Sequence, residues 1–195
     1  MAEIELIDPE ELEEQKKDRF SKRVALMTAM FAVVLAITSL GGSNAMKELL
    51  LSQQQASNQW AYYQSKAMRE HLYRLEVAKT GLALTERGQA MGPAARQAYE
   101  NQLKSFVDEE KRYNGEKKEI EQAAKQLEAQ RDVAQARDPY FDYAEVLLQI
   151  AIVMASIAIL SGSRPVVWIS VGAAGLGSLL SLNGFLLLFR IPFFH

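Results

Sequence analysis

The sequence predicts an all-α integral membrane protein: three transmembrane helices, with a long antiparallel coiled-coil hairpin between the first and the second. Three windows of the chain are almost free of charged residues. A long charged region rich in helix-forming residues lies between the first two windows and is broken once by glycine and proline. The overall composition, 49% hydrophobic and 24% charged, is therefore an average over two environments.

The apolar windows are residues 24–40, 144–160 and 166–189. About 17 residues of α-helix is the lower limit for crossing the bilayer core, and each window reaches it. Only residues 161–165 separate the last two windows, so these helices should be antiparallel neighbours. Burial inside a soluble core is the alternative, but a chain of 195 residues has too little soluble sequence to cover three such helices.

The segment before the first window, residues 1–23, is acidic and then basic. A cleaved signal peptide is the alternative for residues 24–40, because Ser43 and Ala45 offer small residues at a cleavage spacing. The long acidic stretch favours a retained anchor. Basic residues mark the cytoplasmic side of a span, so we expect a cytoplasmic N-terminus, with Arg164 on the same side and the hairpin on the outer side. The basic residues before the first window are Lys16, Lys17, Arg19, Lys22 and Arg23.

Residues 44–137 should form the hairpin, with a turn near residues 87–93. Gly88 or Gly92 can take the left-handed conformation that ends a helix, and Pro93 suits the first turn of the next helix. The two arms are similar in length, so the chain returns to the membrane surface from which it left.

The second arm has a seam at alternating spacings of four and three, which is typical of a coiled coil. The seam is thin and partly charged, so we expect helices of further copies to cover it, in a homo-oligomer of three or more chains. Its members are Tyr99, Leu103, Phe106, Glu110, Tyr113, Lys117, Ile120, Ala124, Leu127, Arg131 and Ala134. We expect the following residues of the first arm to pack against this seam, at less regular spacings: Trp60, Tyr63, Ala67, Met68, Leu72, Leu75 and Leu82. The predicted oligomer interface is Trp60, Tyr63, Tyr99, Phe106, Tyr113 and Ile120.

Inside the membrane, we expect Gln149 and Asn183 to lie at equal depth and to form a hydrogen bond. Small residues of the third window should let the helices approach closely: Ala173, Gly177 and Ser181, with Gly172 and Gly175 also as packing residues. Glu145 and Arg190 are expected to meet nearer the surface.

Several kinds of chemistry have little support. The chain has no cysteine, and a net charge of −2 with interleaved signs does not favour nucleic acid. His71 has no carboxylate at helical spacing, so we predict no metal site. No catalytic triad and no phosphate-binding loop is recognisable, so we predict no catalytic residue and no cofactor.

The stretch from Gln59 to Lys66 (QWAYYQSK), with Arg69, His71 and Leu72 after it, resembles a bacterial membrane protein family catalogued only as a domain of unknown function. Pro139-Tyr140-Phe141-Asp142 and the residues after it are similar to the same family's entry to its second span. The resemblance implies three spans with a helical region between them and supplies no activity or ligand.

These observations favour a non-enzymatic, oligomeric scaffold or interaction protein anchored in the bacterial inner membrane. Its expected partners are the lipid bilayer and further copies of itself, and other protein partners stay unknown. A channel or transporter accessory subunit is the alternative. It would need a polar file through the membrane, for which only a few residues are available: Gln149, Ser156, Ser170, Ser178, Ser181 and Asn183.

Overall fold

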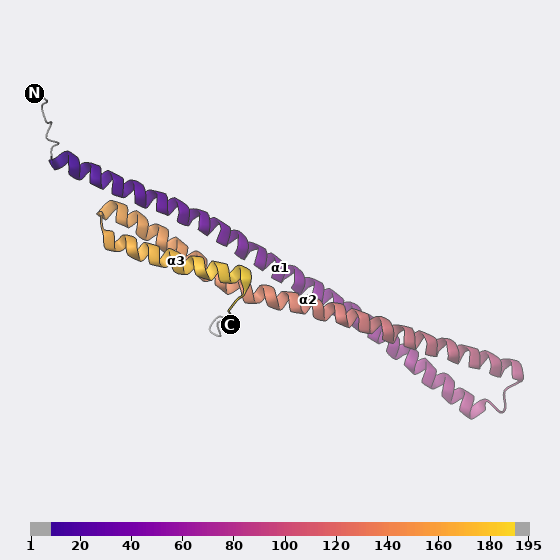
Figure 1. Cartoon of the computed structure of the whole chain (residues 1–195). Helices are drawn as coiled ribbons and strands as arrows, with labels where there is room; N and C mark the ends of the chain where they lie inside the picture. The colour runs from indigo at the N-terminus through magenta and orange to yellow at the C-terminus, as the bar shows by residue number, and fades with distance from the viewer. Residues whose placement is uncertain (1–8, 190–195) are drawn as a thin grey trace, which may run out of the picture. The chain divides into compact units, whose positions relative to one another are not determined.

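A computed structural model describes residues 9–189 of the chain as three helices. Helix α1 runs Pro9–Arg87, α2 runs Pro93–Ser161 and α3 runs Arg164–Leu186 (Figure 1). The described part of the chain contains no strand, so the all-α prediction is confirmed. All three helices contain a segment long and apolar enough to cross a membrane.

The chain divides into two compact units. The span unit consists of Met1–Glu48 and Val133–His195, and it contains the three apolar windows. The arm unit is Leu49–Asp132. Helices α1 and α2 are each continuous across the boundary between the units, and within the span unit α1 includes Gly41-Gly42 and α2 includes Pro139 without a break.

The turn between α1 and α2 falls at the predicted place but has different backbone geometry. Gly88 donates its N–H to the Leu84 carbonyl at 3.0 Å, and a Cβ at this position would lie 2.2 Å from the same oxygen. Glycine is required there by this close approach. Neither Gly88 nor Gly92 is left-handed, contrary to expectation; among the described glycines the left-handed one is Gly162 (φ 64°), between α2 and α3.

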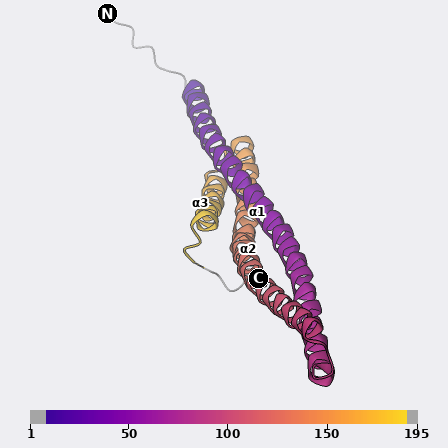
Figure 2. The same ribbon diagram turned by 90° about the vertical axis from the view of Figure 1, so that its right-hand side faces the viewer.

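In the span unit, α2 and α3 pack through small residues and lie side by side in both views (Figure 2). A Cβ at Gly177 would lie 3.1 Å from the Ala144 carbonyl oxygen, which shows how closely the backbones approach. On α1, Phe31, Val34 and Leu35 pack against the core formed by Leu148, Ala151 and Ala174. Spacings of four and three relate the buried residues: Ala144, Leu148, Ala151, Ala155 and Ala158 on α2, and Ser170, Ala174, Gly177, Ser181 and Gly184 on α3.

Helix α3 ends earlier than the third apolar window. Leu187 is left-handed (φ 47°) and donates its N–H to the Asn183 carbonyl at 2.7 Å. The Asn183 side chain then binds the backbone of Phe189, through its Nδ2 at 2.8 Å and its Oδ1 at 3.0 Å. This amide gives Phe189 the backbone partners that a continued helix would otherwise supply.

Candidate functional site

The two arms of the arm unit meet along a seam that is polar at its centre. On α1 the buried residues are Ser52, Ala56, Glu70 and Thr80, and on α2 they include Tyr113, Ile120 and Ala124. Polar contacts between the arms flank this seam: Trp60 donates to Glu128 at 2.9 Å, and Lys66 pairs with Glu116 at 2.6 Å.

Glu70 is the centre of a buried ionic cluster. Its side chain is 1% exposed and forms an ion pair with Lys117 of the other arm. Asn114 donates to Oε1 at 2.9 Å, and Arg74 donates to the same oxygen at 2.7 Å. The hydrogen bond from Lys117 is the main cause that holds the pKa of Glu70 below its ordinary value, and it outweighs the opposite effect of burial. Glu70 is therefore a charged residue inside the seam, with every partner supplied by neighbouring side chains.

Tyr113 lies beside this cluster under three cations. Its ring stacks on Tyr73, with centroids 5.5 Å apart. The phenol oxygen accepts hydrogen bonds from Arg112 at 3.0 Å and from Arg69 at 3.5 Å, and the Lys66 ammonium lies 5.2 Å from the ring centroid. The bond from Arg69 is the first of the causes that lower the pKa of Tyr113. Aromatic and cationic groups thus hold each other in place between the arms.

Most of the predicted interface residues lie between the arms of one chain. Tyr113 and Ile120 are buried, and Trp60, Tyr63 and Phe106 are partly buried. Tyr99 alone among the six is exposed. Their role in contacts between chains stays a prediction, and a substitution such as Tyr113→Asp would disturb the chain's own packing first.

Four apolar residues assigned to the seam face the other way instead. Met68, Leu72, Leu75 and Leu82 are between 50% and 63% exposed. They follow one another at spacings of four, three and seven, so they form one stripe along α1. At about 100° per residue, this stripe lies roughly half a turn of the helix from Glu70. We call these four residues the outer stripe; their assignment to the seam was wrong.

In the span unit, most polar side chains are satisfied locally. Thr38 of α1 donates to Ser181 of α3 at 2.8 Å, and Ser170 donates to the Ala151 carbonyl at 2.7 Å. Ser156 and Ser178 donate to carbonyls of their own helices. Five of the six residues considered for a polar file therefore make local bonds, Asn183 included, and the sixth, Gln149, is exposed. This arrangement favours packing over a pathway.

The predicted contact between Gln149 and Asn183 is wrong. Gln149 lies about 12 residues before the end of α2, whereas Asn183 lies about 19 residues after the start of α3. Because the short connection sets the register, the offset is about 10 Å. Of the small residues, Gly177 and Ser181 are buried and Ala173 packs against the core, whereas Gly172 and Gly175 face open space. The Glu145–Arg190 contact involves a residue outside the described range.

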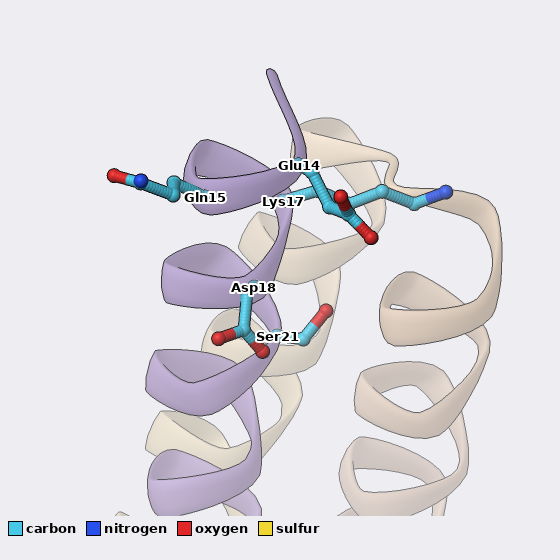
Figure 3. Close-up of a pocket in the computed structure, with 5 residues that line it drawn as sticks. All are labelled: Glu14, Gln15, Lys17, Asp18 and Ser21. Atoms are coloured by element: carbon cyan, nitrogen blue, oxygen red, sulfur yellow. The ribbon is translucent and has the colours of Figure 1, made fainter. Parts of the chain in front are cut away.

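A hollow beside the start of α1 does not have the features of a specific binding site (Figure 3). The described residues that line it all belong to α1 and carry both signs of charge: Glu14, Gln15, Lys17, Asp18 and Ser21. Among the side chains described, those of residues 13–189, no group of three or more His, Asp or Glu is placed to hold a metal ion.

Three helices that are long and apolar enough to cross a membrane suggest a multi-span helical membrane protein. The chain belongs to the family described as a domain of unknown function (DUF4337), whose sequence profile matches residues 20–187. This confirms the resemblance to an uncharacterised family. No curated protein and no solved structure matches the chain.

Proposed function

We propose that this protein is a non-enzymatic, membrane-anchored scaffold of the bacterial inner membrane, whose arms form an antiparallel coiled-coil hairpin that self-associates. The observation that carries the proposal is the outer stripe. Isolated exposed leucines are common on soluble surfaces, but four large apolar residues in one line along a helix indicate a surface for another helix.

The seam of the hairpin supports the same reading. Its centre is a charged cluster and its first arm contributes small residues, so it buries little aliphatic surface. Burying a leucine side chain stabilises by about 1.5 to 3 kcal/mol when it is fully exposed beforehand. The half-exposed residues of the outer stripe would each add on the order of 1 kcal/mol on association. A second copy of the chain presents the same outer stripe, so two copies can bury their stripes against each other in a symmetric contact.

Assembly is tested with the full-length protein in mild detergent. Native mass spectrometry should find more than one chain per particle, and Leu72→Glu/Leu75→Glu should shift the distribution towards the monomer by at least about tenfold, because each copy would bury two charges. The matched control is Gln122→Glu/Gln126→Glu, which adds the same charge on an exposed part of the other arm. A fully helical wild-type monomer would contradict the proposal, as would equal effects of the two variants.

The proposed orientation places the N-terminus in the cytoplasm and the hairpin outside. It is supported by the span unit, in which Lys16, Arg19 and Arg23 of α1 line one cavity together with Arg164 of α3. These basic residues therefore gather at the same end of the unit, as the positive-inside rule requires of short cytoplasmic segments.

Orientation is tested by single cysteines, since the chain has none of its own. In cells stripped of the outer membrane, Gln89→Cys in the turn between the arms should react with an impermeant thiol reagent. Ser161→Cys at the end of α2 should react only after lysis. The reverse pattern would invert the orientation.

A further inference from the structure

A cavity of about 540 Å³ lies in the span unit, between the start of α1 and the start of α3. Four cationic side chains line it: Lys16, Arg19 and Arg23 from α1, and Arg164 from α3. The first three follow at spacings of three and four, so they share one face of α1. No described carboxylate lines the cavity.

The charges around this part of α1 are unevenly distributed. Glu14 and Asp18 lie on the side that borders the hollow in Figure 3, and there Asp18 pairs with Lys22 at 2.7 Å. None of the four cavity cations has an ion-pair partner among the described side chains. Because these four cations line one concave site, they leave a positive potential there that an anion would relieve.

The remaining wall of the cavity is apolar and aromatic. Phe20 of α1 and Val167 and Trp168 of α3 line it, and Trp168 is 74% exposed. The cavity lies where the first and third apolar windows begin, which is the depth of lipid headgroups in a chain that spans the membrane. Tryptophan is enriched at this depth because its ring is apolar and its N–H is polar. Basic rim and apolar wall together match a molecule with an anionic head and a hydrocarbon body.

We propose that this cavity binds the phosphate of an anionic phospholipid headgroup. Arg19, Arg23 and Arg164 contact the phosphate oxygens, and Lys16 adds charge at the rim. Guanidinium groups suit this role because they donate two parallel hydrogen bonds to phosphate oxygens. The acyl chains leave along Phe20 and Trp168. The apolar wall is what distinguishes a lipid phosphate from free phosphate as the occupant.

The first test is native mass spectrometry of the full-length protein in detergent with phosphatidylglycerol or phosphatidylcholine added. Wild type should retain phosphatidylglycerol at least about tenfold better. Arg19→Gln/Arg23→Gln should lose about thirtyfold in affinity, because it removes two guanidinium contacts with the phosphate, each contributing on the order of fivefold. Arg164→Gln, on the other helix, should lose about fivefold. The control Lys17→Gln/Lys22→Gln removes two charges from the same part of α1 at positions that do not line the cavity, and should change affinity by less than about threefold.

A second readout places the lipid at the cavity. In a Trp60→Phe background Trp168 is the remaining tryptophan of the two in the chain. Brominated phosphatidylglycerol should quench it at lower lipid concentration than brominated phosphatidylcholine, and Arg19→Gln/Arg23→Gln should abolish this difference. Equal losses in the two double variants would show only diffuse charge attraction and would overturn the site. Binding of inorganic phosphate as tight as that of the lipid would overturn the lipid assignment.

Discussion

Replacement of Glu70 by alanine is expected to lower the free energy of unfolding of the arm unit by about 3 kcal/mol, because it leaves Lys117 and Asn114 without their partner inside the seam. Trp60 reports on this unit through fluorescence, in a Trp168→Phe background and with the full-length protein in detergent. The control Glu76→Ala removes a carboxylate that pairs with Lys79 on the surface and should cost less than about 1 kcal/mol.

A second variant distinguishes the effect of an uncompensated charge from the effect of lost side-chain volume. Glu70→Leu/Lys117→Leu removes both members of the pair, so we expect stability close to that of the wild type. Arg74 keeps its bond of 2.9 Å to Glu110 in this variant. If the double variant were as unstable as Glu70→Ala, the loss would come from packing and not from an uncompensated charge.

The cluster around Glu70 should also make the stability of the arm unit depend on pH. The pKa of Glu70 is lowered in the folded chain, so its ion pair stabilises fully above the unfolded pKa of about 4.3 and the stabilisation is lost as the pH falls through the folded value. In Glu70→Gln, the free energy of unfolding should decrease less steeply than in the wild type as the pH falls below about 4.3. Some slope should persist, because the hydrogen bond from Lys66 also lowers the pKa of Glu116.

The second large effect is expected where the ring of Phe141 lies against three glycines. A Cβ at Gly41 would lie 2.7 Å from Cε1 of Phe141 and 2.6 Å from Cζ of Phe185, and a Cβ at Gly184 would lie 3.0 Å from the Phe141 ring. The two rings already meet edge to face at 4.9 Å, and Phe141 is buried. A Cβ at Gly42 would lie 3.1 Å from the Cβ of Phe141. The ring therefore has little room to move.

Gly41→Ala/Gly184→Ala should therefore destabilise the span unit by about 2 to 4 kcal/mol, with overpacking exceeding the gain in helix propensity of about 1 kcal/mol at each site. The matched control is Gly172→Ala/Gly175→Ala, where a Cβ meets nothing within 4 Å and no loss is expected. Unfolding is followed by Trp168 fluorescence in a Trp60→Phe background. Phe141→Leu in the destabilised variant should recover part of the loss, and equal stability of both glycine pairs would refute the close-packing argument.

The sequence alone determined the helical class, the three apolar windows and the place of the turn between the arms, because these depend on local composition. Apolar runs of sufficient length and the Gly88 to Pro93 break are visible without any partner. The register of α2 and α3 was also accessible, since a two-residue connection sets it; counting from the distant ends of the windows instead produced the wrong Gln149–Asn183 contact.

Only the tertiary structure decided which face of each helix is covered. Hydropathy favoured the leucines of the outer stripe for the seam, but the seam contains Glu70, which is buried because Lys117 and Asn114 of the other arm neutralise and bind it. Those partners lie more than 40 residues further along the chain. The cationic cavity likewise combines α1 with α3. Such choices depend on matching side chains that are distant in sequence, and the local pattern of one helix contains no information about its neighbour.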